Sequence, residues 1–183
     1  MKKNLNISIS IFGEKDVGKS TLIKDYITER KFGNIKDNKG GCMSFTKPFK
    51  DKNSVKLNLY EFSEIPEKKK EIAAQQCIII MFDMTSRKAF EDVLDKWVKF
   101  LRDIKYSNTI ILFGTQNYKK EKPILMTDEE EINELIDVAK IKGTFHNIGN
   151  KNTKEKNELI DNLIETSYEE AKTNQNKKDC IIF

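Results

Sequence analysis

A glycine-bearing segment close to the N-terminus carries the clearest chemistry in the sequence. Residues 13–20 read Gly-Glu-Lys-Asp-Val-Gly-Lys-Ser and fit the spacing G-x-x-x-x-G-K-[ST]. In this pattern the glycines let backbone N–H groups turn toward an anion, the lysine reaches the β- and γ-phosphates, and the hydroxyl ligates Mg²⁺. The residues predicted to contact the phosphates and the metal are Gly13, Glu14, Lys15, Asp16, Val17, Gly18, Lys19, Ser20 and Thr21.

The segments on either side supply the strand and the helix that such a motif requires. Leu5–Phe12 alternates apolar and polar residues, as a strand does, and Ser20–Arg30 places its apolar residues at helical spacing. A chance glycine turn is the alternative interpretation. The strand–helix context favours phosphate binding over it.

The rest of the chain continues this alternation of strands and helices. Strands are expected at Met43–Phe49, Val55–Glu61, Cys77–Asp83, Thr109–Gly114 and Thr144–Ile148, the first two as an antiparallel hairpin. Helices are expected at Ser86–Lys105, from Thr127 to about Lys140, and at Glu155–Ala171. A loop is expected over Lys31–Cys42, and a loop or a short distorted helix over Phe62–Lys70, which contains Pro66. The pattern indicates a doubly wound α/β domain whose ligand binds at the carboxyl ends of the strands.

Composition excludes several other classes. The 183 residues are 38% hydrophobic and 34% charged, which suits one water-soluble domain with no bilayer-spanning run and no secretory signal. A net charge of +4, with Lys interleaved among Glu and Asp, predicts no nucleic-acid partner. Three dispersed cysteines and the single His146 predict neither a disulfide framework nor a metal cluster.

With the phosphate motif, this order of elements resembles a Ras-superfamily small GTPase over nearly the whole chain. Residues 79–97 and 111–115 resemble its Rab-like and septation-initiation branches. The resemblance implies a P-loop NTPase G domain over 1–173, with a mostly parallel six-stranded sheet, one antiparallel edge strand and about five helices. A flexible tail would follow over 174–183. It also implies GTP or GDP with Mg²⁺, and effector and exchange-factor proteins bound through residues 31–49 and 61–75.

The two switch segments depart from the family pattern. Asn38 or Lys39 stands where the family has its first-switch Thr. The D-x-x-G element is matched by residues 61–64, in which Glu61 keeps an acidic, water-mediated link to Mg²⁺ and Glu64 replaces the glycine. Ile65 replaces the catalytic glutamine. Because a hydrocarbon side chain cannot orient water, hydrolysis is expected to be slow or absent.

The base-reading segments depart as well. Residues 115–118, Thr-Gln-Asn-Tyr, match the family's N-K-x-D, so that Tyr118 replaces the carboxylate that pairs with guanine. Losing a bidentate hydrogen-bonded pair is expected to relax guanine specificity. The residues expected to contact the base are Phe32, Thr115, Gln116, Tyr118, Asn150 and Lys151.

No catalytic residue is assigned firmly. Lys15, beside the γ-phosphate position, is either a solvent-facing lysine or a cation that stands in for an arginine finger.

The last four residues, Cys-Ile-Ile-Phe, have the form C-a-a-X. The terminal Phe indicates geranylgeranyl transfer to Cys180, with an unmodified terminus as the alternative. The chain is then expected on the cytoplasmic face of a cellular membrane as a peripheral, lipid-anchored protein. One lipid and a thin basic tail give reversible attachment.

Two functions follow from this pattern. One is an atypical membrane-anchored GTP-binding switch for signalling or trafficking, enzymatically a weak GTPase. The other is a pseudo-GTPase, a binding module that does not cycle nucleotide. A P-loop nucleotide kinase is disfavoured because its lid needs several arginines, and this chain has only Arg30, Arg87 and Arg102.

Overall fold

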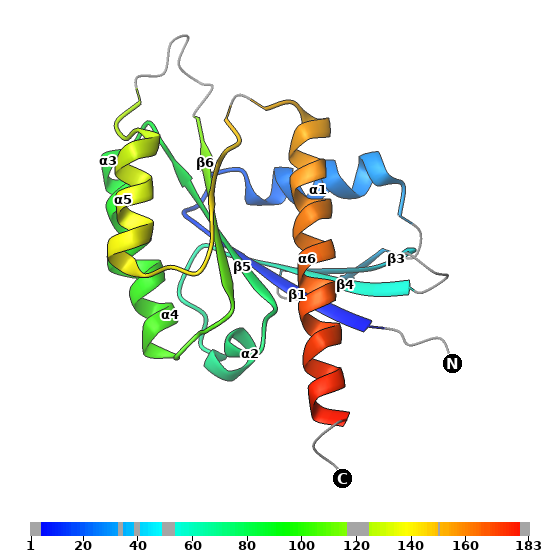
Figure 1. Ribbon diagram of the computed structural model, residues 1–183. Helices are drawn as coiled ribbons and strands as arrows, with labels where there is room; N and C mark the ends of the chain where they lie inside the picture. Colours follow the sequence, from blue (N-terminus) through cyan, green and yellow to red (C-terminus); the bar gives the residue numbers. More distant parts are fainter. Residues whose placement is uncertain are drawn as a thin grey trace.

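A mixed β-sheet forms the middle layer of the molecule (Figure 1). The computed structural model describes residues 5–32, 35–38, 41–48, 54–116, 125–149 and 151–179, with the backbone alone at 37–38 and 174–179. Within these residues the sheet order is β2-β3-β4-β1-β5-β6-β7. The strands are β1 (Leu5–Phe12), β2 (Lys36–Asn38), β3 (Cys42–Pro48), β4 (Ser54–Phe62), β5 (Cys77–Asp83), β6 (Thr109–Thr115) and β7 (Phe145–Asn147).

Strand directions confirm the predicted fold class. β4, β1, β5, β6 and β7 pair in parallel, whereas β3 runs antiparallel to both β2 and β4. The three-residue β2 falls inside the segment predicted as a loop and extends the predicted antiparallel edge by one short strand. Because the parallel strands share a direction, the carboxyl ends of β1, β4, β5 and β6 meet at one edge of the sheet.

Helices cover both faces of the sheet (Figure 1). They are α1 (Lys19–Arg30), α2 (Lys69–Ala73), α3 (Arg87–Asp92), η2 (Val93–Val98), α4 (Lys99–Asp103), α5 (Glu129–Ala139) and α6 (Thr153–Asp179). α3, the π-helical turn η2 and α4 follow one another directly and fill the place of the single helix predicted over 86–105. α1 and α6 pack on one face, while α2 to α5 pack on the other.

The buried strand β5 joins the two apolar layers. Ile79 and Met81 belong to the layer under α1 and α6, and Ile78 and Ile80 belong to the layer under α2 to α5. A strand covered on both faces has no polar side, which is why its sequence is an almost continuous apolar run.

The final helix is longer than predicted. α6 continues to Asp179, beyond the expected end at Ala171, and so includes part of the segment predicted as a flexible tail. It is tied to its neighbours through Asp161, which accepts hydrogen bonds from Tyr26 (2.7 Å) and Lys47 and pairs with Arg30 at 2.6 Å. Among the helices described, none is long and apolar enough to cross a bilayer.

Candidate nucleotide site

The loop between β1 and α1 is pressed closely against β5. Gly13 has φ +153°, and a Cβ atom there would lie 2.3 Å from the carbonyl oxygen of Met81. Gly18 has φ +103° and precedes α1 without a capping side chain, so the first-turn N–H groups of this helix face the loop uncapped. Glycine adopts these positive φ values without strain, and at position 13 it alone leaves room for the Met81 carbonyl oxygen. The loop is therefore concave and presents N–H groups at a helix N-terminus.

Lys19 lies inside this loop and not in solvent. Its side chain is only 5% exposed, and its Nζ donates to the carbonyl oxygens of Gly13 (2.9 Å) and Glu14 (2.6 Å). Burial lowers the pKa of Lys19, and the nearby acidic residues Glu61 and Asp16 act in the opposite direction. A phosphate would supply the negative charge that a buried ammonium requires, so the loop fits an anionic group.

The two predicted metal-binding residues lie together. Ser20 Oγ donates to Glu61 Oε2 at 2.6 Å, joining the first turn of α1 to the end of β4. A hydroxyl and a carboxylate beside a phosphate loop form the hard oxygen donor set that suits Mg²⁺. The described residues contain no cluster of three or more His, Cys, Asp or Glu that would hold a metal without a phosphate.

Two residues that the sequence did not predict also lie at this site. Ser63 accepts a third hydrogen bond from Lys19 Nζ at 2.9 Å, and Lys96 donates to the Ser63 carbonyl oxygen at 3.2 Å. Ser63 had one signal in the sequence, its place inside the stretch matched to D-x-x-G. Lys96 had none, because it lies 33 residues away on the polar side of a helix.

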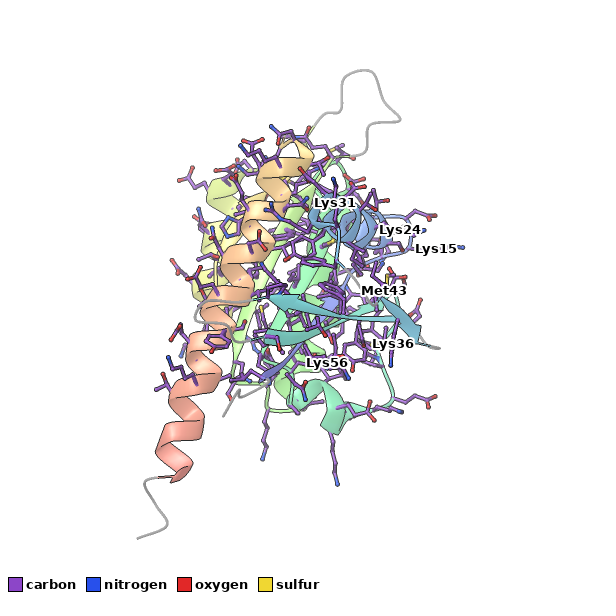
Figure 2. All side chains as sticks on the ribbon, turned by 90° about the vertical axis from the view of Figure 1, so that its right-hand side faces the viewer. Lys15, Lys24, Lys31, Lys36, Met43 and Lys56 are labelled. Carbon is purple, nitrogen blue, oxygen red and sulfur yellow. The ribbon has the colours of Figure 1, made fainter. Side chains whose placement is uncertain are left out.

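The side chains at the second and third loop positions turn away from the phosphate cradle. The pKa of Glu14 is raised, first by its hydrogen bond with Asp92 and then by burial and the Asp92 charge, with Lys88 and Lys96 opposing. Lys15 is exposed and points outward from the loop (Figure 2).

Two of the predicted base-reading segments lie side by side. The Ile148 N–H donates to the Gly114 carbonyl oxygen at 2.8 Å, and a Cβ at Gly149 would lie 2.5 Å from Gln116 Cγ. The end of β6, with Thr115 and Gln116, therefore packs against the loop that leads to Lys151.

The other predicted contacts are placed differently or not described. Phe32 stacks on Phe45 with ring centroids 4.5 Å apart and contacts Tyr26 at 5.4 Å, so its ring is engaged in the apolar layer under α1. Tyr118, Asn150 and the prenylation residue Cys180 lie outside the described residues.

A groove of about 580 Å³ opens on the antiparallel side of the sheet. Its lining residues are Ile35, Lys36, Ser44, Phe45, Thr46 and Lys56. Lys36 pairs with Ser44 across one side of β3, and Lys56 pairs with Thr46 across the other, so the two lysines flank this strand. Figure 2 looks onto this side of the molecule, with Lys24 and Lys31 at α1 above the groove.

Comparison with known proteins agrees with this geometry. A family model described as the Ras family matches residues 8–169, which span the phosphate loop, both switch segments and most of α6. No curated protein matches the chain.

Proposed function

The chain belongs to the Ras family of small GTP-binding proteins, and we propose that it is an atypical, membrane-anchored member in which hydrolysis is slow or absent. The observation that carries nucleotide binding in this proposal is the Lys19 ammonium, held over the loop by the carbonyls of Gly13 and Glu14. The phosphate contacts would depend on these residues, which belong to the phosphate loop that the chain keeps intact.

The residues of the site would have distinct roles in binding the phosphates and the metal ion. The uncapped N–H groups of α1 and Lys19 would hold the phosphates, while Ser20 and Glu61 would hold Mg²⁺, Glu61 through water. Bound Mg²⁺ neutralises charge on the β- and γ-phosphates. Ile65, where the family has a water-orienting glutamine, leaves the attacking water without a positioning group, and this is why slow turnover is proposed.

Identification of the bound nucleotide tests the proposal. Purified protein is heated to release its ligand, the ligand is separated by chromatography, and reloaded GTP is followed for hours. We expect a guanine nucleotide, GTP that stays largely unhydrolysed, and detectable ATP binding because Tyr118 lacks the guanine-pairing carboxylate. Rapid hydrolysis would contradict slow turnover, and rejection of ATP would contradict the relaxed base specificity.

One observation favours the pseudo-GTPase as the second candidate. The segment that matches the family's second switch is tied to the phosphate loop and to η2, because Lys19 and Lys96 both donate to Ser63. A protein whose second switch keeps this arrangement with GDP and with GTP would be a constant binding module. Equal hydrogen-exchange protection of residues 61–66 in both nucleotide states would select this candidate over the switch.

Effector and exchange-factor proteins are proposed to bind through residues 31–49 and 61–75. The groove beside β3 is flanked by two exposed lysines, Lys36 and Lys56, and is lined by the apolar side chain of Ile35. Charge complementarity therefore favours an effector segment that carries acidic side chains around an apolar one.

Charge reversal tests the partner surface. A partner captured by cross-linking is purified and its binding measured against the double variant Lys36→Glu/Lys56→Glu. We expect about a tenfold slower association and a weaker salt dependence, because opposite charges steer the encounter. The double variant Lys99→Glu/Lys105→Glu, on α4 and just after it, makes the same change in net charge and should behave as wild type. Unchanged association of the double variant would place the partner elsewhere.

Membrane attachment completes the proposal. It depends on geranylgeranyl transfer to Cys180 in the C-terminal Cys-Ile-Ile-Phe sequence, which would hold the protein at the cytoplasmic face of a membrane. A single lipid chain gives only marginal binding, so attachment is proposed to be reversible.

A further inference from the structure

Ser63 is held from two sides at the end of β4. Lys19 Nζ donates to its hydroxyl oxygen at 2.9 Å, and Lys96 Nζ donates to its carbonyl oxygen at 3.2 Å. Lys96 is itself fixed, because its ammonium lies 4.4 Å from the centre of the Trp97 ring and Trp97 is buried. The Ser63 hydroxyl therefore has a defined position beside the phosphate-binding lysine.

The bond from Lys19 leaves the hydroxyl hydrogen of Ser63 for donation to an anion. An ammonium has three N–H donors, and those of Lys19 go to Gly13 O, Glu14 O and Ser63 Oγ. Since Ser63 accepts in this bond, its own O–H hydrogen is not used by it. A phosphate oxygen that binds beside Lys19 would accept this hydrogen, and the Lys19 bond to Ser63 Oγ would keep the hydroxyl in place.

The neighbouring residue, Glu64, does not direct its negative charge toward such an anion. Glu64, which follows Ser63 directly, is 89% exposed and its carboxylate faces Lys96 at 3.4 Å. An exposed pair of this kind contributes little energy, but it indicates that the carboxylate is directed toward the helix and solvent. The side chain nearest to Lys19 in this stretch is thus a hydroxyl donor and not an acid.

We propose that the Ser63 hydroxyl is the group by which this chain distinguishes a nucleoside triphosphate from a diphosphate, with Lys96 as its positioning residue. The inference rests on the proposed nucleotide binding and goes beyond it, because it assigns the contact with the terminal phosphate to one side chain. Ser63 would supply a side-chain donor near the terminal phosphate in a chain whose first switch has no Thr.

Affinity measurements on nucleotide-free protein with Mg²⁺ test this assignment. The probes are a non-hydrolysable GTP analogue and GDP. Ser63→Ala is expected to weaken the analogue about tenfold while GDP affinity stays unchanged, because one hydrogen bond to a charged group is lost only with the triphosphate. Ser63→Thr keeps the hydroxyl and should retain the preference. Lys96→Met should lower it about threefold, since the hydroxyl remains but its support is lost.

Lys99→Met is the matched control, since Lys99 is an exposed lysine on α4, which continues directly from η2. It should leave both affinities unchanged, and thermal melting checks that each variant is folded. Equal weakening of GDP and the analogue by Ser63→Ala, or weakening of neither, would overturn the assignment while leaving nucleotide binding intact. Failure of the wild-type protein to bind either probe would instead overturn the proposed function and this inference with it.

Discussion

Replacement of Lys19 by methionine is expected to lower the affinity for GTP by at least about 100-fold and for GDP by at least about tenfold. Charge-assisted hydrogen bonds contribute about 1.5–3 kcal/mol each, and the ammonium would lose at least two of them with GTP but only the one to the β-phosphate with GDP. Lys19 already lies in place for this contact, since its ammonium is bonded to the loop carbonyls of Gly13 and Glu14. Calorimetric titration with each nucleotide in the presence of Mg²⁺ measures the loss.

Lys24→Met is the control for this substitution. Lys24 is an exposed lysine on the same helix, so its loss changes the net charge equally without touching the loop (Figure 2). The Lys19 variant itself should stay folded, because removing a buried charge relieves desolvation while the methionine fills the space. Affinities of Lys19→Met within tenfold of wild type would show that the loop does not bind phosphates through Lys19.

The Trp97→Ala substitution is expected to destabilise the protein by about 3–5 kcal/mol, the usual cost of removing a large aromatic side chain from a packed core. Trp97 is 1% exposed and stacks on Phe12, with ring centroids 5.2 Å apart and planes inclined by 23°. Phe12 is the last residue of β1, directly before the phosphate loop, so the cavity would open beneath the site. Urea unfolding of the nucleotide-free protein measures the change in the free energy of unfolding.

Val138→Ala provides the comparison for this stability measurement. Val138 is 79% exposed on α5, so its truncation should change the free energy of unfolding by less than about 0.5 kcal/mol. A loss below about 1 kcal/mol for Trp97→Ala would contradict the packing described for the layer under α2 to α5. The same variant also removes the ring under Lys96, so it should reduce the preference for triphosphate where it remains folded.

Most of the fold could be predicted from periodicity, and the exceptions have physical causes. β5 was predicted because a strand covered on both faces must be apolar throughout. β2 was missed because three residues, Lys36–Asn38, are too few to show an alternating pattern. The end of α6 was placed too early because the polar residues after Ala171 lack the apolar stripe from which a packed helix is inferred.

The phosphate loop and the Ser20–Glu61 pair could be predicted because each belongs to a motif with fixed spacing. The contact between Lys96 and Ser63 could not, because it joins a helix to a strand end and depends on how the two elements pack. The π-helical turn η2, which includes Lys96 and Trp97, has no signal in the hydrophobic pattern. Phe32 was expected at the base, and its ring stacking on Phe45 also results from tertiary packing.

Thermal unfolding of the nucleotide-free protein, with and without Mg²⁺ and a guanine nucleotide, decides whether this loop binds nucleotide. A ligand that binds only the folded state at about 100 times its Kd stabilises it by about 2.7 kcal/mol, which raises the Tm of a chain of this size by about 5–10 °C. We expect such a shift with GDP and with a non-hydrolysable GTP analogue, and its absence with the analogue in Lys19→Met. An unchanged Tm of the wild-type protein with both nucleotides would contradict nucleotide binding at this loop.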